Sequence, residues 1–184
     1  MEEHNEPVID EDSELMARVQ KGDERAFAVL VNKHQKKIVN FFLRSGVQSD
    51  AEDLTQQTFL RLYRYRDRYQ PTAKVTTFLF LLTRQVWIDE LRRRERFDRL
   101  TSALSAELQD ETTSSAADEV AAADDWGDVA KALASLPEGQ RLVVELGVYQ
   151  ELPYAEIAQI LGVPEGTVKS RMFHALAHLR KKLS

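Results

Sequence analysis

Hydrogen-bond donors recur on one face of the helix expected near the C-terminus. Hydroxyl, amine, guanidinium and imidazole groups can donate to phosphate oxygens and to base edges in the DNA major groove. A solvated face on an ordinary amphipathic helix has the same pattern. The candidate DNA-binding residues on this helix are Thr167, Lys169, Ser170, Arg171 and His174.

A second polar stripe lies on the helix expected from about Thr76 to Arg96. Gln85, Asp89, Arg92 and Arg96 follow one another at nearly helical spacing, with Arg93 and Arg94 beside them. Glutamine can bind adenine edges, and arginine can bind guanine or phosphate. Lys74 and the aromatic residues near the start of this helix could hold unstacked bases. The alternative is a basic, solvated helix end that the helix dipole favours.

An enzyme is the main alternative from a different class. His174 and His178 have the i, i+4 spacing of metal ligands, but no glutamate follows His174 as in a hydrolase motif. The chain has no cysteine and no glycine-rich phosphate loop. We therefore expect no catalytic site, no metal and no cofactor. Zinc or nucleotide binding by the pure protein would favour an enzyme instead.

The C-terminal donors require a helix-turn-helix to position them. Tyr154–Leu161 has the small and apolar spacing of a short helix, and Gly162 permits the positive φ of a helix end. Pro164 cannot continue that helix but suits the start of another. Two short helices set at an angle by such a turn place the second helix in the major groove. Its expected core stripe is Val168, Met172, Leu176, Leu179 and Leu183.

The first part of the chain predicts a separate helical domain. Apolar periodicity indicates helices over about 15–44, with a break at Gly22-Asp23, over 51–69 and over 76–96. No segment has a convincing strand pattern, so the fold class is all-α. Leu60 lies on the outer face of the second of these segments, among Asp53, Gln56, Gln57, Arg61 and Arg64. A leucine in that setting suggests a protein-binding surface, although single exposed leucines are common.

Charge divides the chain into blocks. The net charge is −5, yet residues 15–97 carry 17 Lys and Arg against 9 Asp and Glu, a basic balance typical of a phosphate binder. The segment 98–125 is acidic and rich in small residues, so we expect a flexible linker. This linker could also compete with DNA for the basic faces or enter a basic channel of a partner. The predicted organisation is an acidic extension (1–13), a helical domain (14–97), the linker (98–125) and a helix-turn-helix domain (126–184).

Composition also limits the location of the protein. No run of about 18 apolar residues is present, so no membrane insertion is expected. The acidic start, Met1–Glu6, lacks the basic and apolar regions of a signal peptide. A cytoplasmic protein is the expectation.

Four motifs resemble those of bacterial sigma factors of the extracytoplasmic-function (ECF) group of the sigma-70 family. The similarity covers about residues 14–97 and 126–184, both domains in order. The matching segments are Ala51–Tyr63, Val86–Arg94, Leu136–Arg141 and Tyr154–Arg171.

The resemblance implies a non-enzymatic factor that binds core RNA polymerase, through the β′ clamp and the β flap, and directs it to promoter DNA. It implies an anti-sigma protein as the expected inhibitor. By resemblance, the clamp-binding residues are Asp53, Gln56, Gln57, Leu60 and Arg64. The −35 element would be read by the C-terminal residues given above. The −10 element would be bound by Lys74, Thr76, Arg84, Gln85, Asp89, Arg92, Arg93 and Arg96.

A stand-alone helix-turn-helix regulator is the second alternative. It predicts tight, specific duplex binding without polymerase, usually as a dimer on symmetric sites. The sigma interpretation predicts weak specific binding alone and strong dependence on polymerase.

Overall fold

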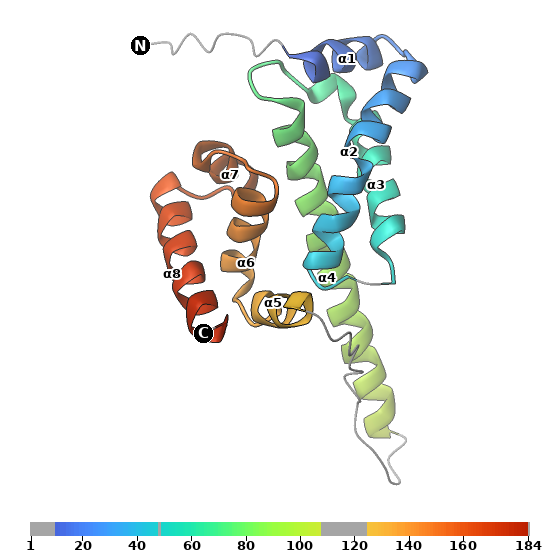
Figure 1. The fold of residues 1–184 in the computed structure, drawn as a ribbon. Coiled ribbons are helices and arrows are strands. Elements are labelled where there is room, and N and C mark those ends of the chain that lie inside the picture. The colour runs from blue at the N-terminus through green and yellow to red at the C-terminus, as the bar shows by residue number, and fades with distance from the viewer. Residues whose placement is uncertain (1–9, 48, 108–124, 184) are drawn as a thin grey trace.

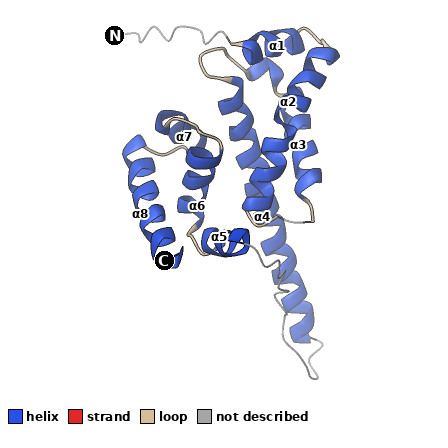
Figure 2. Cartoon of the chain, in the orientation of Figure 1, coloured by secondary structure: helices blue, strands red, loops and turns tan. Residues whose placement is uncertain are grey.

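The computed structural model describes residues 10–47, 49–107 and 125–183. Within these ranges all regular structure is helical and no strand is present (Figure 2). The helices form an N-terminal and a C-terminal domain (Figure 1). The all-α fold with two helical domains, the second holding a helix-turn-helix, is therefore confirmed. No described helix is long and apolar enough to span a membrane.

The N-terminal domain contains four α-helices and a short 3-10 turn. The helices are α1 (Glu11–Gln20), α2 (Glu24–Arg44), α3 (Ala51–Arg64) and α4 (Val75–Glu107), and the 3-10 turn η1 covers Arg66–Arg68. Aromatic and aliphatic side chains from all four helices form one core. Its largest fully buried members are Trp87, Phe41, Phe42, Phe80, Met16, Leu30, Ile38 and Leu62.

Aspartates begin the first two helices. Asp10 forms a capping box with Ser13, so α1 begins at Glu11, earlier than the expected Leu15. Asp23 accepts hydrogen bonds from the backbone N–H groups of Arg25 and Ala26, as expected for the cap of α2. Gly46, with φ of 87°, follows the end of α2. The expected break at Gly22-Asp23 is confirmed.

The third helix differs from its prediction at both ends. Asp50 precedes α3 but makes no side-chain capping bond. Its carboxylate instead lies 3.2 Å from an Arg94 guanidinium nitrogen. The helix ends at Arg64 rather than Tyr69, because the chain turns through η1. Tyr69 still enters the core and donates a hydrogen bond to the Ala73 carbonyl.

Helix α4 is longer than expected and continues into the predicted linker. It has 33 residues, about 50 Å at 1.5 Å per residue. The residues after Arg96 contain no glycine or proline to stop the helix, and Thr101 donates a side-chain hydrogen bond to the Phe97 carbonyl. The rest of the predicted linker, 108–124, lies outside the described residues, as does the N-terminal extension through residue 9.

The C-terminal domain contains α5 (Asp125–Ala134), α6 (Glu138–Val144), the π-helical turn η2 (Glu145–Tyr149), α7 (Tyr154–Leu161) and α8 (Glu165–Leu183). Gly162 has φ of 65°, the left-handed conformation that the helix-turn-helix prediction requires. The carbonyl of Pro164 accepts from the backbone N–H groups of Thr167 and Val168 at the start of α8. The expected turn is therefore confirmed.

The predicted core stripe of α8 is partly wrong. Val168 and Met172 are buried and Leu179 is half-buried, but Leu176 and Leu183 are 48% and 47% exposed. At 100° per residue, Val168, Met172, Ala175 and Leu179 share a narrow arc, from which Leu176 and Leu183 are displaced. Ala175 is fully buried because its small side chain lets α8 pack closely on its neighbours.

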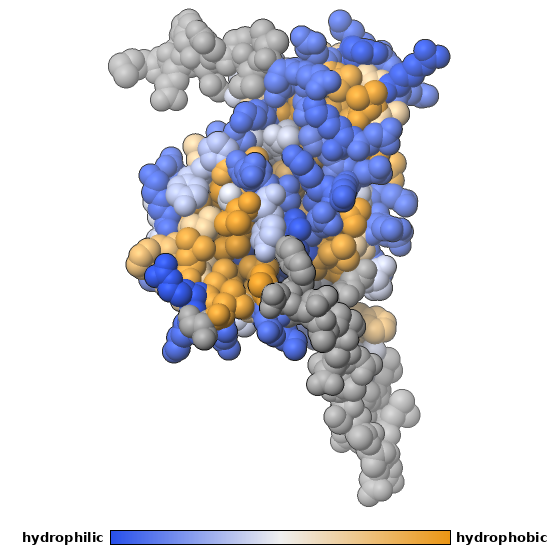
Figure 3. Space-filling model, in the orientation of Figure 1, coloured by the Kyte–Doolittle hydropathy of each residue, from blue (hydrophilic) through white to orange (hydrophobic). Residues whose placement is uncertain are grey.

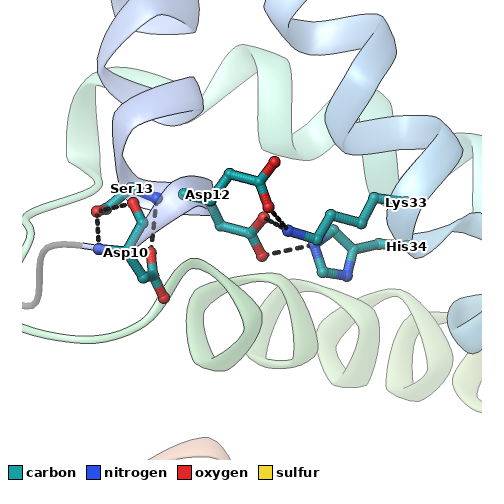
Figure 4. A network of polar contacts seen from close by, with 6 residues as sticks. Asp10, Asp12, Ser13, Lys33 and His34 are labelled. Atoms are coloured by element: carbon teal, nitrogen blue, oxygen red, sulfur yellow. Dashed lines mark hydrogen bonds and ion pairs between the residues drawn. The ribbon is translucent and has the colours of Figure 1, made fainter.

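A buried histidine connects α1 to α2 (Figure 4). His34 Nε2 lies 2.8 Å from an Asp12 carboxylate oxygen, while Lys33 Nζ lies 2.7 Å from the other oxygen. Burial lowers the pKa of His34 below its usual 6.5, although the Asp12 carboxylate opposes that shift and Lys37 adds to it. The imidazole is therefore neutral and donates to Asp12. Lys33 and His34 lower the pKa of Asp12, against the effect of burial.

This histidine predicts a loss of stability in mild acid. As pH falls below about 6.5, the unfolded chain gains a proton on His34 that the folded chain does not, so folding loses free energy. We expect the unfolding free energy to be lower at pH 5 than at pH 7 because of this group. Urea denaturation at both pH values measures the unfolding free energy. Its change between the two pH values should be smaller in His34→Gln than in the parent protein. An equally large change in His34→Gln would contradict the assignment, and His178→Gln should behave as wild type.

Candidate nucleic-acid and protein interfaces

The candidate donors of α8 are accessible to solvent to different degrees. In Figure 1, α8 lies on the side of the C-terminal domain opposite α4. Lys169, Ser170 and His174 are exposed, and Thr167 and Arg171 are half-buried. Lys169 Nζ lies 2.8 Å from a Glu165 carboxylate oxygen, which raises the pKa of Lys169. Along α8, Thr167, Ser170 and His174 lie on one side, and Lys169 and Arg171 lie on its two flanks.

Arg171 packs against the start of α6. A Cβ atom at Gly139 would lie 3.1 Å from Arg171 Cζ, so a side chain at this position would require the guanidinium to move by a few tenths of an ångström. Sequence reasoning did not find this contact, since 32 positions separate the two residues. The glycine of the Leu136–Arg141 motif is the signal that could have pointed to it. The contact holds Arg171 beside the recognition face of α8.

The two histidines of α8 do not form a metal site with other described residues. His178 Nε2 lies 3.1 Å from Ser135 Oγ, directly after α5, whereas the His174 ring lies edge-on against the Phe173 ring. No group of three histidine or acidic residues in the described ranges has the placement of a metal site.

The predicted stripe of α4 is accessible along its length. Gln85, Asp89, Arg92 and Arg96 are all exposed. Asp89 accepts a 2.8 Å hydrogen bond from Arg61 Nη2 on α3. Arg61, Gln85, Asp89 and Arg92 line a shallow depression of about 320 Å³ together with Ile88. Helices α3 and α4 thus present one polar surface with bases and acids side by side.

The neighbouring arginines are held by a buried acid. Glu90 is 5% exposed and accepts hydrogen bonds from Arg93 and Arg94 at 2.6 to 2.8 Å. Both guanidinium groups lower its pKa, Arg93 most strongly. Asp50 lies 3.2 Å from Arg94 and 3.8 Å from Arg93, and the Arg93 side chain is 61% exposed against 37% for Arg94. Arg93 is therefore the better placed of the two to contact a phosphate.

The loop before α4 lies against the second domain. Lys74 Nζ lies 2.9 Å from Glu156 Oε1 on α7. Thr77 Oγ1 donates a 2.6 Å hydrogen bond to the other oxygen of the same carboxylate. Thr76 and Arg84 are half-buried, and the Nε of Arg84 has no hydrogen-bond partner. This arrangement of the loop was not expected from the sequence.

The outer face of α3 borders an apolar groove that it shares with α2. Leu60 is 64% exposed, and the four other predicted protein-binding residues, Asp53, Gln56, Gln57 and Arg64, are exposed as well. An apolar groove of about 300 Å³ runs beside Leu60. Sequence reasoning missed the part of this groove on α2, although its residues follow a helical period; the groove is lined by Phe27, Val31, Gln35, Thr55, Gln56, Phe59 and Leu60.

The C-terminal domain also presents apolar surface. Figure 3 shows hydrophobic residues gathered over this domain. Leu176 and Leu183 on α8 are about half exposed, and Val129, Ala132 and Leu183 line a depression of about 510 Å³ between α5 and the end of α8. Exposed apolar surface of this kind is typical of protein–protein contacts.

Both domains match known family models. Residues 30–97 match the model described as Sigma-70 region 2, and residues 127–179 match the model described as Sigma-70, region 4. The chain is 32% identical over 164 residues to the ECF RNA polymerase sigma factor RpoE of Cereibacter sphaeroides, with 88% of each chain covered. It is 28% identical over 179 residues to the ECF RNA polymerase sigma-E factor of Escherichia coli K12, with 94% of each covered.

Solved structures share the fold. CnrH, solved in complex with the cytosolic domain of CnrY, matches with a TM-score of 0.72 at 24% identity, covering 95% of this chain and 97% of CnrH. RpoE of Bartonella quintana, solved in complex with the anti-sigma factor NepR, matches with a TM-score of 0.66 at 23% identity, covering 85% of this chain and 96% of RpoE.

The contacts of Glu90 with Arg93 and Arg94 predict that replacing Glu90 lowers stability. Replacing Glu90 with glutamine removes a nearly buried charge from two guanidinium groups, which should cost about 1–3 kcal/mol of unfolding free energy. Glu95→Gln, at an exposed position 3.8 Å from Arg99, should change it by less than about 0.5 kcal/mol. Urea denaturation at pH 7 measures both variants. Equal effects would show that Glu90 contributes no more than a surface acid.

Proposed function

The chain belongs to the ECF group of the sigma-70 family, and we propose which of its surfaces contact polymerase and promoter. As a sigma factor it is not an enzyme. It directs RNA polymerase in promoter recognition and transcription initiation, and the sigma interpretation replaces the stand-alone regulator and the enzyme. We propose that it acts in the cytoplasm, where its polymerase works.

The α3 face docks on the β′ clamp of core polymerase. The observation that carries this assignment is Leu60, 64% exposed beside an apolar groove and surrounded by the polar residues Asp53, Gln56, Gln57 and Arg64. An apolar residue within a polar rim has the composition of a protein interface, where the centre excludes water and the rim fixes orientation. The groove extends the docking surface to Phe27 and Val31 of α2.

Two faces then contact the promoter. The exposed stripe of α4 binds the −10 element, together with Lys74, Thr76, Arg84 and Arg93, since glutamine and arginine can bind both bases and phosphates. The five donors of α8 bind the −35 element in the major groove, as the helix-turn-helix geometry favours. The apolar surface between α5 and α8 contacts the β flap of polymerase.

An anti-sigma protein is the proposed inhibitor. The solved structures that share this fold include CnrH in complex with the cytosolic domain of CnrY, and the sigma factor RpoE in complex with the anti-sigma factor NepR. The exposed apolar surfaces on α3 and on α8 give this chain two contacts that such an inhibitor could cover.

Leu60 provides the first test of polymerase binding. Leu60→Asp places a charge at the centre of the proposed interface and should weaken binding to core polymerase at least tenfold, about 1.4 kcal/mol or more. Val29→Asp is the matched control, because Val29 is also exposed, at 47%, and lies on the side of α2 away from the groove. Titration of labelled protein with core polymerase measures both. Equal affinities for the two variants would disprove the assignment of the α3 face.

Lys169 and Arg171 provide a test of −35 binding. Each phosphate contact contributes about 0.9 to the slope of log affinity against log salt concentration. Replacing both with alanine should therefore reduce the slope for promoter binding by the polymerase complex by about 1 to 2. Lys21→Ala, an exposed change directly after α1, should leave the slope unchanged. An unaltered slope in the double variant would remove these two residues from the DNA interface.

A further inference from the structure

The loop between η1 and α4 is spanned by one side chain. Four of the five loop residues, 70–74, are exposed, and Ala73 is half-buried. Tyr69, directly before the loop, is buried. Its hydroxyl donates a 2.9 Å hydrogen bond to the Ala73 carbonyl, and its ring lies 5.7 Å from the ring of Phe78 on α4. Tyr69 therefore fixes the end of the loop relative to its start.

Gln20 connects α1 to the start of the same loop. Its side-chain Nε2 donates to the carbonyl oxygens of Arg66 and Tyr69, at 2.9 and 3.0 Å. Arg66 is the first residue of η1, and Tyr69 directly follows η1. Because a primary amide carries two donors, this one side chain can hold both ends of the turn. Gln20 lies 46 and 49 positions before its two partners, so no local pattern indicates the contact.

Helix α1 is a fixed base for the Gln20 contact. Met16 and Val19 of α1 are fully buried in the core of the domain. Asp12, near the other end of the helix, is bound by two side chains of α2 (Figure 4). These contacts hold α1 in place independently of the loop, and Gln20 ties the loop to it.

Tyr69 stays a hydrogen-bond donor in the neutral range. Burial raises the pKa of Tyr69 to about 12, and the carboxylates of Asp10 and Asp12 add to this shift. The phenol therefore keeps its proton at neutral pH. The hydrogen bond to the Ala73 carbonyl does not depend on pH in this range.

The contacts of Gln20 and Tyr69 limit the shapes that the loop can take. An exposed loop without them would sample many conformations and would lose that freedom when a ligand bound. A loop that already has its bound shape loses less conformational entropy on binding, so it binds more tightly. Pro71 acts in the same direction, because its ring fixes φ at about −65°.

We propose that Gln20 and Tyr69 are positioning residues that hold the 70–74 loop in the shape that binds the single-stranded −10 element. The proposal rests on the proposed function for the assignment of Lys74 and Thr76 to that element. Neither positioning residue contacts DNA, because Tyr69 is buried and the amide of Gln20 is bound to two carbonyl groups. The −10 site thus depends on α1, a helix that carries none of its DNA-binding residues.

Hydrogen exchange in the free, full-length chain tests the positioning directly. Gln20→Met keeps the length of the side chain without a donor, and Tyr69→Phe removes only the hydroxyl. In both variants the amides of the peptide 65–78 should exchange several times faster than in the parent protein, because the loop opens more often. Mass spectrometry after digestion measures this exchange.

Two control variants change groups that do not hold the loop. Tyr63→Phe removes a hydroxyl that has no hydrogen-bond partner in the part of the chain that the structure describes, and Lys21→Ala truncates the exposed neighbour of Gln20. Both should exchange as the parent protein does, and urea denaturation should show every variant fully folded at pH 7. Parent-like exchange in both Gln20→Met and Tyr69→Phe would overturn the positioning of the loop.

Binding of a single DNA strand then tests what the positioned loop does. The probe is a strand labelled with 2-aminopurine, copied from the non-template −10 region of a promoter at which core polymerase with this chain starts transcription. Gln20→Met and Tyr69→Phe should each weaken its binding to the polymerase complex about threefold to tenfold, the range for the loss of one or two hydrogen bonds. The affinities for core polymerase and for a −35 duplex should stay at the parent values. Global destabilisation would not separate these affinities.

Salt dependence separates the positioning residues from the DNA contacts. Each phosphate contact to a single strand contributes about 0.7 to the slope of log affinity against log salt concentration. Lys74→Ala should lower the slope by about that amount, whereas Gln20→Met and Tyr69→Phe should leave it unchanged.

The outcomes distinguish this inference from the function on which it rests. Parent-like strand affinity in both positioning variants, despite faster exchange in the loop, would overturn their role in −10 binding. An unchanged slope and affinity in Lys74→Ala would instead count against the −10 assignment, while the hydrogen-exchange result would still decide whether Gln20 and Tyr69 hold the loop.

Discussion

Burial of α4 is the constraint on which the arrangement of the other elements depends. Its first half contributes Leu79, Phe80, Leu82, Val86 and Trp87 to the core, and it contacts α1, α2 and α3 on one side and α7 on the other. A helix that is apolar nearly all round must be covered on several sides. One helix therefore fixes the N-terminal bundle, carries the polar stripe at Gln85–Arg96 and provides the seam for the second domain.

Electrostatics in this molecule depend on which acids are buried. Glu90, Glu145 and Asp12 are nearly buried, and each is bound by cations or by histidine from its surroundings. These pairs orient the arginines and lysines that would otherwise move freely in solvent. The net charge of −5 is a sum over the whole chain. The first domain is nevertheless basic, and these buried acids hold some of its basic side chains at defined places on the surface.

The local sequence pattern predicted most of the helices. The differences between the predicted and the observed structure come from contacts between residues far apart in the sequence. Gly162 and Pro164 were sufficient to predict the helix-turn-helix, because their backbone preferences act within a few residues. Leu176 was misplaced because a close approach at Ala175 rotates the buried arc of α8. The exposure of Leu60 was predicted from the face of its helix, but the groove beside it requires α2. The Arg44–Glu145 pair joins residues 101 positions apart, a relation that no local pattern contains.

The part of α4 after Trp87 extends beyond the core of the first domain, and its end determines where the connection between the domains starts. From Trp87 to Glu107 the helix advances by about 30 Å, so the connecting segment begins well away from the core of the first domain. An α-helix turns about 100° and rises about 1.5 Å for each residue. Inserting one residue after Trp87 would therefore lengthen the helix by about 1.5 Å and rotate its last residue by about 100° around the helix axis. The number of residues in this part of α4 therefore sets a direction as well as a length.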